Sequence, residues 1–517
     1  MLYTLQMKKM NKTVSPKTDQ RKIGSFIKRL RTEEGFTQAD FAEALGTTQS
    51  AIARMETGNQ NMTLEQLEKI GSILERNVIS LSETTDLKIT GGQKLKGSIT
   101  TNTSKNGAIN MLVATLINTG KTTLHNVPKV QEVFRYIELL ESIGVTIVWK
   151  SDSTLEVTVP KKLSIEKIDA VVANKIRSFT FLGGLIHHSS HFSFPHSGGC
   201  KMGARTIASH KFGLEKLGVA IETKDAEYII THKKLKPSDI VMYESSDTGA
   251  ITLIIAAARI AGTTVIKFAP PNYQVQDVCH LLQNMGVQID GIGTTTLTVH
   301  GKETISGNFT GYVSEDPIES MFFIAAAIVT DSTLTVERVP IEFIELEMEK
   351  LLQMGLKFKI SEPYLGNNGF IKLVDITVMP SKLTSVSEKI HTQPFPGIQN
   401  DNLPFFVPIC LKAEGKTLIH DWTWENRAIY FMELNHLGAG LTLLDPHRVL
   451  VDGPQKLKGA QIICPPALRP SASILIAMLG AEGVSTLRNV YSITRGYEDV
   501  AERLNSIGAK IEVLKGI

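Results

Sequence analysis

The segment from Pro195 to His210, PHSGGCKMGARTIASH, carries the residue types that point most clearly to chemistry. Its glycines indicate a mobile loop, and Cys200 stands between a Gly-Gly pair and Lys201, with Arg205 a few residues further on. Positive neighbours stabilise a thiolate, and the thiolate is the reactive form of cysteine. A single cysteine is usually a core residue, but a core cysteine rarely stands between Gly-Gly and Lys. We therefore predict a functional thiol at Cys200.

Two further strings place polar residues at the starts of predicted helices. Lys105 and Asn106 stand just before an apolar helix, where a cation and an amide are well placed for an anion. An ordinary helix start explains the same string, and we favour it when the string is taken in isolation. Asp316, in SEDPIES, also stands at a predicted helix start and is a candidate general base.

Three arginines lie in apolar or small-residue surroundings: Arg177 in NKIRSFTF, Arg427 in WENRAIY and Arg469 in ALRPSAS. Half-buried arginines need anionic partners, which are either nearby Asp and Glu or a shared ligand that carries phosphate and carboxylate groups. The sequence has no metal-ligand cluster, P-loop or dinucleotide fingerprint, and its cysteines form no CxxC pair. An anion site would therefore be built from side chains.

Composition limits the class of protein that positions these residues. The chain has 517 residues, of which 55 are Lys or Arg and 52 are Asp or Glu, and 42% are hydrophobic. This length predicts two to four domains, and the near-neutral balance excludes a polyelectrolyte whose main role is coating nucleic acid. The apolar runs are too short to span a bilayer, and no secretory signal follows the Lys-rich N-terminus. We expect a soluble, cytoplasmic protein with no membrane contact.

Beyond residue 86, one pattern recurs six times: a helix that ends in a Leu-x-x-hydrophobic-Gly string or a near variant, followed by a strand. Each glycine is predicted to be a left-handed helix C-cap. Six copies of a unit of about 70 residues predict an α/β fold in which three units at a time surround buried helices. Two such halves would leave a cleft between them, where ligands tend to bind. The shared glycines are Gly144, Gly218, Gly286, Gly355, Gly438 and Gly508.

The N-terminal part has a different, all-helical pattern. Residues 1–20 form a basic tail, and the string FTQADFAEALGTTQSAIARMETG in residues 21–81 resembles the Cro/C1-type (XRE family) helix-turn-helix domain. The resemblance implies that Gln49, Ser50 and Arg54 face the major groove of DNA, and that Gln38 binds a backbone phosphate. The alternative is a helical bundle that has kept the fold and lost DNA binding, or that binds protein.

Residues 87–517 resemble the UDP-N-acetylglucosamine 1-carboxyvinyltransferase family. That family has a two-domain inverted α/β barrel of six βαβαββ-type repeats, and the resemblance implies that the chain returns to the first half near its C-terminus. The family's Lys-Asn pair falls on Lys105 and Asn106, and its Gly-Cys-x-x-Gly-Ala-Arg loop falls on residues 199–205. Its catalytic Asp falls on Asp316. Its anion-binding arginines fall on Arg177, Arg427 and Arg469.

The resemblance implies that the enolpyruvyl group of phosphoenolpyruvate passes to the 3′-hydroxyl of UDP-N-acetylglucosamine with release of phosphate, the first committed step of peptidoglycan synthesis. Cys200 would be the general acid and Asp316 the general base, while Lys105, Arg205 and Arg469 would neutralise phosphoenolpyruvate. Arg177 and the segment Arg205–His210 would help to hold the UDP-sugar, together with the backbone near Asp247, Thr248 and Gly249. Asn106 and Arg427 would be further substrate-binding residues. The chemistry that the resemblance implies requires no metal or organic cofactor.

The chain departs from the family at several positions. It has Leu352 where an arginine is usual, Ala208 where an acid is usual, and an unusual segment at residues 391–404. Leu352 and the DNA-binding head motivate one alternative, a transcription regulator that senses a UDP-sugar without turnover. A second alternative is a sister transferase acting on a shikimate phosphate. The Cys200 loop argues against the second, and retention of both acid and base argues against the first.

Overall fold

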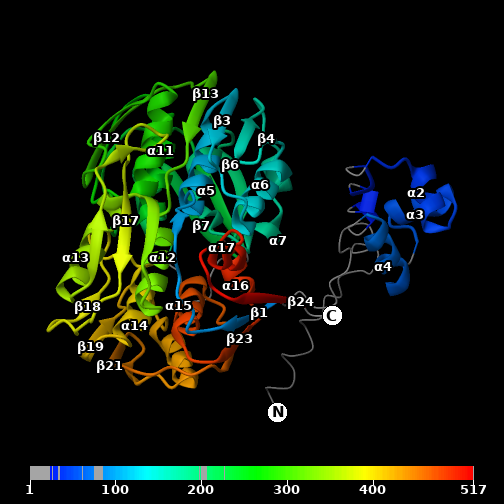
Figure 1. The fold of residues 1–517 in the computed structure, drawn as a ribbon. Helices are drawn as coiled ribbons and strands as arrows, with labels where there is room; N and C mark the ends of the chain where they lie inside the picture. The colour runs from blue at the N-terminus through cyan, green and yellow to red at the C-terminus, as the bar shows by residue number, and fades with distance from the viewer. Residues whose placement is uncertain are drawn as a thin grey trace, which may run out of the picture. The chain divides into compact units, whose positions relative to one another are not determined.

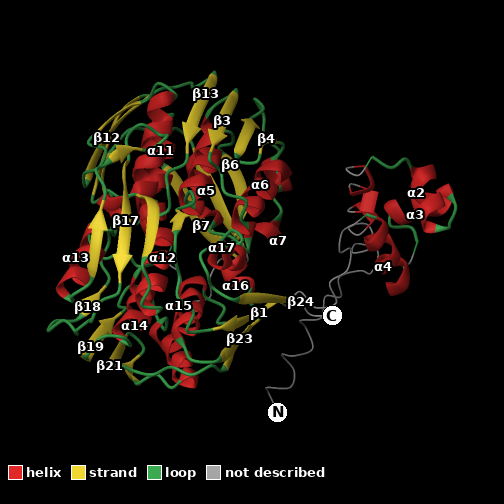
Figure 2. Ribbon diagram, in the orientation of Figure 1, coloured by secondary structure: helices red, strands yellow, loops and turns green. Residues whose placement is uncertain are grey.

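The computed structural model describes residues 24–25, 27–28, 30–32, 35–60, 62–74, 85–196, 198, 207–225 and 227–515. The chain divides into two compact units, one of which is Thr85–Leu514, called the body below. The other comprises residues 1–84 together with the last three residues, and its described residues 24–74 are called the head. Figure 1 shows the course of each unit, and Figure 2 shows that the head is helical whereas helices and strands alternate throughout the body.

The head contains three complete helices whose starts and ends follow from side-chain caps. Thr37 and Asp40 form a capping box at α2 (Gln38–Leu45), and Gly46 ends that helix with a φ of 69°. Thr48 caps α3 (Gln49–Glu56), because its side chain accepts a hydrogen bond from the Ala51 N–H. A second capping box, of Thr63 and Gln66, starts α4 (Leu64–Ile73). These helices pack on a small core that includes Ile27, Leu30, Phe41 and Ile52.

The body contains six small sheets, which correspond to the six predicted repeats. Buried residues form two large cores, one from Leu87–Ile99 together with Ile318–Ile511, and one from Ala108–Val313. We call the parts around these cores the first half and the second half, in the order in which the chain enters them.

The first half has three sheets around three buried helices that pack against one another, α12 (Pro317–Val329), α14 (Leu403–Cys410) and α15 (Leu468–Gly480). Its other helices are η5 (Ile341–Phe343), α13 (Glu345–Gln353), η6 (Ala428–Leu437), α16 (Tyr491–Thr494) and α17 (Val500–Ser506). Its strands are β1 (Thr85–Thr90), β2 (Ser98–Thr100), β14 (Leu334–Val339), β15 (Lys357–Ile360), β16 (Tyr364–Leu365), β17 (Lys372–Met379), β18 (Ile390–His391), β19 (Gly415–His420), β20 (Leu441–Asp445), β21 (Arg448–Gly453), β22 (Gln461–Ile463), β23 (Val484–Arg488) and β24 (Ile511–Lys515).

The second half also has three sheets, and its most buried helices are α5 (Lys105–Ala114) and α10 (Asp247–Ala258). Its other helices are η2 (Thr115–Ile117), α6 (Gln131–Ser142), η3 (Ile165–Lys167), α7 (Ala170–Ala173), η4 (Ser178–Phe181), α8 (Leu182–Leu185), α9 (Ala208–Lys216) and α11 (Tyr273–Asn284). Its strands are β3 (Lys121–His125), β4 (Thr146–Ser151), β5 (Thr154–Thr158), β6 (His191–Pro195), β7 (Val219–Lys224), β8 (Glu227–His232), β9 (Asp239–Val241), β10 (Gly262–Lys267), β11 (Gln288–Asp290), β12 (Thr296–Gly301) and β13 (Asn308–Tyr312).

The repeat glycines have the conformation that the sequence predicts. All six have a positive φ, between 82° at Gly286 and 106° at Gly508. Only glycine adopts this region without a steric cost, so each repeat can turn sharply from its helix into the following strand. The prediction of six left-handed caps is confirmed.

Two crossings connect the halves, and they lie side by side. The first joins β2 to α5 and the second joins β13 to α12. Backbone hydrogen bonds link them: the Ser104 N–H donates to Ser314 O at 2.7 Å, and the Asp316 N–H donates to Asn102 O at 2.8 Å. The chain therefore returns to the first half near residue 314, and the expectation of a return near the C-terminus is wrong.

No helix in the described part of the chain is long and apolar enough to cross a membrane.

Candidate active site

The paired crossings bring two predicted site residues to the same place. Lys105 directly follows the first crossing as the first residue of α5, and Ser104 caps that helix. Asp316 ends the second crossing and caps α12, accepting a hydrogen bond from the Ile318 N–H at 2.9 Å. The sequence interpretation placed Lys105 and Asn106 just before a helix, and they are instead its first two residues.

Lys105 is buried and paired with a carboxylate that the sequence interpretation missed. Its Nζ lies 2.7 Å from Glu132 Oε2 in α6 and donates to Asn106 Oδ1 at 3.1 Å. Burial raises the pKa of Glu132, but the charge and hydrogen bond of Lys105 outweigh that effect and lower the pKa to about 2. Burial lowers the pKa of Lys105, and the Glu132 charge opposes this change. Glu132 therefore compensates the charge of the buried Lys105.

Arg469, at the start of α15, is the cation on the opposite side of the site. Its side chain is 5% exposed, its Nε lies 3.1 Å from Asp401 Oδ2, and its Nη1 donates to Tyr497 Oη at 2.7 Å. Its Nη2 is buried and has no hydrogen-bond partner among the described residues. A buried guanidinium with a donor to spare suits an incoming phosphate or carboxylate.

Asp401 is a second carboxylate at this site, besides Asp316. Burial raises the pKa of Asp401, but the charges of Arg469, Arg427, Arg177 and Lys105 outweigh it and lower the pKa to about 2. Burial raises the pKa of Asp316, and the nearby Arg469 opposes that shift. Both carboxylates therefore lie near the same cations. These cations lower the pKa of Asp401, whereas burial prevails at Asp316 and raises its pKa.

Arg177 of the second half and Arg427 of the first half both lie near the ring of Trp424, so this ring links the two halves at the site. The guanidinium carbons lie 5.7 Å (Arg177) and 5.8 Å (Arg427) from the Trp424 ring centre. Arg427 is fully buried: it pairs with both oxygens of Asp421 and donates from Nη2 to Asn400 O at 2.6 Å. The sequence left open whether the arginines bind nearby acids or a shared anionic ligand. For Arg427, the nearby acid Asp421 accounts for most of the contacts.

Four of the residues predicted to hold a sugar nucleotide, His210, Asp247, Thr248 and Gly249, lie at the start of α10 in the second half. His210 Nδ1 lies 2.8 Å from Thr252 Oγ1, and its Nε2 lies 3.3 Å from Thr248 Oγ1. Asp247 accepts from Asn272 Nδ2 at 2.9 Å and from Gln274 Nε2 at 2.5 Å. Burial raises the pKa of Asp247 to about 6. Gly249 donates its N–H to Ser246 Oγ, which caps the helix.

The buried acid Asp277 forms hydrogen bonds to the second crossing. The Asp277 carboxylate accepts hydrogen bonds from the Ser314 hydroxyl and N–H, two residues before Asp316. Burial, together with the charge of Glu315, raises the pKa of Asp277 to about 7. The hydrogen bonds from Ser314 oppose this shift but do not cancel it.

This raised pKa gives a prediction for the Asp277→Asn variant. The protonated acid is favoured in the folded state up to about pH 7, whereas the unfolded chain releases the proton near pH 4. The wild-type protein therefore loses stability relative to the variant as pH rises from 4 to 8. Chemical denaturation of both proteins at pH 5 and pH 8 measures the change, and a stability difference that does not depend on pH would contradict it.

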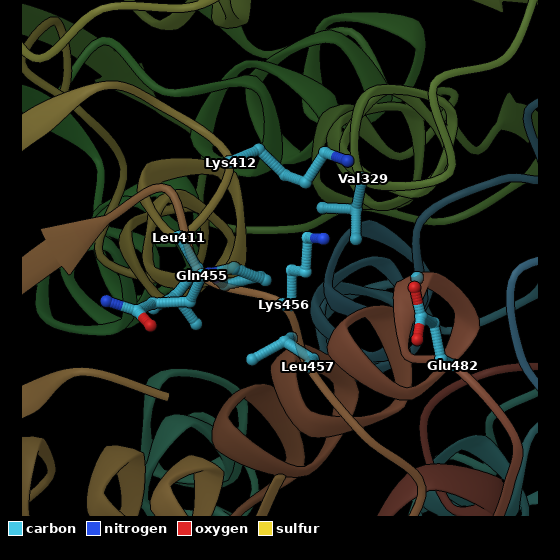
Figure 3. Close-up of a pocket in the computed structure, with 9 residues that line it drawn as sticks. Val329, Leu411, Lys412, Gln455, Lys456, Leu457 and Glu482 are labelled. Carbon is cyan, nitrogen blue, oxygen red and sulfur yellow. The ribbon is translucent and has the colours of Figure 1, made fainter. Parts of the chain in front are cut away.

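A hollow at the far end of the first half is not part of this site (Figure 3). Lys412, Lys456 and Glu482 extend along its walls, and Gly480 also lines it. Gly480 ends α15 whereas Arg469 is its second residue, so the two residues lie about 16 Å apart at 1.5 Å per residue. None of the residues predicted for chemistry lines this hollow.

Comparison with known proteins agrees with the arrangement of the body. The family profile described as EPSP synthase (3-phosphoshikimate 1-carboxyvinyltransferase) matches residues 89–504. The chain belongs to the enolpyruvyl transferase family. The UDP-N-acetylglucosamine 1-carboxyvinyltransferase of Lawsonia intracellularis is 32% identical over 82% of this chain and 98% of its own length. The enzyme of the same name from Campylobacter jejuni is 31% identical over 83% of this chain and 100% of its own length.

Solved enolpyruvyl transferases share the fold. The enolpyruvyl transferase NikO from Streptomyces tendae matches with a TM-score of 0.71 at 23% identity, over 84% of this chain and 100% of its own. EPSP synthase from Acinetobacter baumannii matches with a TM-score of 0.62 at 18% identity, over 83% of this chain and 100% of its own. A helix-turn-helix profile matches residues 27–78, which confirms the fold predicted for the head.

Part of the predicted site lies outside the described residues. Cys200, Lys201 and Arg205 all fall in the undescribed stretch 199–206, so their chemistry rests on the sequence of this enolpyruvyl transferase. The other cysteines, Cys279, Cys410 and Cys464, are buried. No group of three or more His, Cys, Asp or Glu side chains within the described ranges could hold a metal ion.

The sequence interpretation missed four residues of this site: Glu132, Asp401, Arg495 and Tyr497. Arg495 is close enough to Glu132 to lower the pKa of that carboxyl, and its Nε is buried with no hydrogen-bond partner among the described residues. The string TRGYED holds Arg495 and Tyr497, and its Gly496 lies close to Lys105, since a Cβ there would be 3.3 Å from Lys105 Cε. In the sequence, the arginine next to a glycine in TRGYED was the signal that could have pointed to this part of the site.

Proposed function

We propose that the body transfers the enolpyruvyl group of phosphoenolpyruvate to the 3′-hydroxyl of UDP-N-acetylglucosamine and releases phosphate. The observation that carries this proposal is the pairing of Lys105 with Glu132 and of Arg469 with Asp401 where the halves meet. Both cations are buried, and Arg469 keeps a donor without a partner in the described structure. Phosphoenolpyruvate carries a phosphate and a carboxylate, which match two such cations.

The reaction needs a proton donor and a proton acceptor. A proton delivered to the methylene carbon makes the neighbouring carbon electrophilic, and the sugar hydroxyl oxygen bonds to that carbon as it loses its own proton. Loss of phosphate and of a proton from the new methyl group then restores the double bond. Cys200 is our proposed acid, and Lys105, Arg205 and Arg469 bind the anionic groups.

Two carboxylates can accept the hydroxyl proton. The sequence favoured Asp316, but its side chain caps α12 and the residue is only 6% exposed. Asp401 is only partly buried and lies on the segment between β18 and α14. Because a general base must reach the substrate, we propose Asp401 as the acceptor in spite of its low pKa, and we keep Asp316, whose pKa burial raises, as the alternative.

We propose that the UDP-sugar is held from the second half by Asn106, Arg177, His210 and the start of α10 at Asp247, Thr248 and Gly249. His210 is held by the hydroxyls of Thr248 and Thr252 in α10, and Asp247 is held by the side-chain amides of Asn272 and Gln274. A helix start presents unpaired N–H groups and favours anions, which supports a diphosphate ligand there.

Cys200 gives the experiment for this function. We expect Cys200→Ser to lower turnover by at least 100-fold, since a hydroxyl is a far weaker acid than a thiol with cationic neighbours. Fosfomycin, which alkylates the corresponding cysteine in the family, should modify Cys200 and no other cysteine. Mass spectrometry of the loop peptide reads the modification. An unmodified loop, or full turnover by the serine variant, would remove Cys200 from the mechanism.

We propose that the head binds DNA through α3. Gln49, Ser50 and Arg54 are exposed on this helix, while Ala51 and Ile52 are buried. Gln38 is less available for a backbone phosphate than the sequence suggests, because its Nε2 donates to Glu56 Oε2 at 2.7 Å. Glu56 also pairs with the buried Arg31, so this contact fixes α3 against the rest of the head.

Arg54 gives the corresponding prediction. Arg54→Ala should weaken binding to duplexes selected from a random pool by about tenfold, because a lost base contact costs about 1–3 kcal/mol. Binding by the wild-type head should also weaken steeply as salt rises. Lys389→Ala, at an exposed lysine of the body, is the charge-matched control. Equal effects of both variants, or binding that ignores salt, would favour a head that does not read DNA.

A further inference from the structure

Glu347 is a buried acid on α13 for which the proposed reaction has no role. It is 1% exposed, yet it lies on a helix whose neighbouring residues Glu345 and Glu349 are exposed. A buried carboxylate is costly unless hydrogen bonds satisfy it. Its Oε1 accepts two: one from the Gln399 N–H at 3.1 Å and one from Asn402 Nδ2 at 2.8 Å.

The segment that Glu347 binds, residues 399–402, is the one that carries Asp401. Gln399 Nε2 donates to Phe343 O at 3.0 Å, which adds a second link to the same end of α13. The Asn402 N–H donates to Gln399 O at 2.9 Å, so the four residues form a closed turn. Gln399 and Asn402, the two ends of the turn, are thus bound to α13 and η5.

The two middle residues of the turn face the arginines instead. Asn400 O accepts from Arg427 Nη2 at 2.6 Å, and Asp401 Oδ2 lies 3.1 Å from Arg469 Nε. The turn is therefore a bridge between the Glu347 carboxylate on one side and two site cations on the other. Movement of its ends away from α13 would move the Asp401 carboxylate relative to Arg469.

We infer that Glu347 is a positioning residue that sets the place of Asp401 by holding both ends of the 399–402 turn. This role rests on the proposed function of the site, since it matters for turnover only if Asp401 meets the substrate. Both hydrogen bonds end on a single oxygen, so glutamine at this position keeps them and leucine loses them. Burial raises the pKa of Glu347 to about 7, which makes the neutral amide of glutamine a close substitute.

Three variants test this inference. We expect Glu347→Leu to lower kcat at least tenfold while the KM for UDP-N-acetylglucosamine changes less than threefold. Glu347→Gln should keep kcat within threefold of the wild type. Met348→Ala is the structural control, because Met348 is 3% exposed on the same helix and packs in the first-half core. This control should lower Tm without lowering kcat.

Hydrogen exchange gives a readout that does not depend on activity. The Gln399 N–H is itself a donor to Glu347, so the peptide that contains it should exchange faster in Glu347→Leu than in the wild type and at the wild-type rate in Glu347→Gln. If Glu347→Leu does not fold, Asn402→Ala removes the link from the turn side and should show the same loss of kcat.

Two results would overturn the inference: a leucine variant with kcat within twofold of the wild type, or a methionine control that loses as much kcat. Unchanged exchange of the Gln399 peptide in the leucine variant would also overturn it. The proposed function can fail separately. If hydrogen exchange changes as expected but the wild-type protein shows no turnover, the proposed function is contradicted, while the link between Glu347 and the turn is supported.

Discussion

Arg469→Ala is expected to reduce kcat/KM for phosphoenolpyruvate by at least 100-fold. Arg469 is the buried guanidinium that pairs with Asp401, donates to Tyr497 and keeps Nη2 without a partner in the described structure. In the proposed reaction, its loss removes charged hydrogen bonds to phosphoenolpyruvate, and it leaves Asp401 without the cation with which it pairs. Removing one preorganised donor from a dry site typically costs about 10²–10³ in rate.

Arg469→Lys is the matched variant for this experiment. Lysine keeps the charge but not the planar fork, so we expect partial activity, with a larger defect in KM than in kcat. Thermal unfolding of both variants shows whether the fold survives. A folded alanine variant with near wild-type kcat/KM would show that Arg469 does not bind the reacting anion.

The second large effect is expected at Asp401. Asp401→Asn should lower kcat by about 10²–10⁴, the usual contribution of a general base. Asp316→Asn should have a smaller effect, because asparagine can still cap α12 and the Asp316 side chain is largely enclosed.

Measuring kcat for both variants side by side decides between the two carboxylates. A larger loss in Asp316→Asn than in Asp401→Asn would return the role of base to Asp316. Equal and small losses would mean that neither carboxylate takes the proton.

Much of the fold could be predicted because local chemistry specifies it. The six glycines end their helices in the left-handed region, as their sequence pattern predicts. What could not be predicted is the pairing of the crossings near residues 102 and 316. That pairing depends on long-range backbone hydrogen bonds, and it moves the return crossing far from the C-terminus.

The site was predictable only where a residue type is unusual for its surroundings. Arg469 stood out among small and apolar residues, whereas Glu132 lies in an ordinary string and Asp401 lies in a segment that stood out only for its departure from the family. Both acquire their roles through tertiary contacts with Lys105 and Arg469. Leu352, which motivated a weakened anion site, is 51% exposed on α13, unlike the buried arginines. This exposure weakens the case for a sensor without turnover.

The most direct test of the central claim is phosphate release by the full chain supplied with phosphoenolpyruvate, with and without UDP-N-acetylglucosamine, with the mass of the product recorded. We predict release that requires the sugar nucleotide and a product heavier than UDP-N-acetylglucosamine by one enolpyruvyl group. Binding of the sugar nucleotide without phosphate release would contradict the account and favour a sensor that regulates through the head.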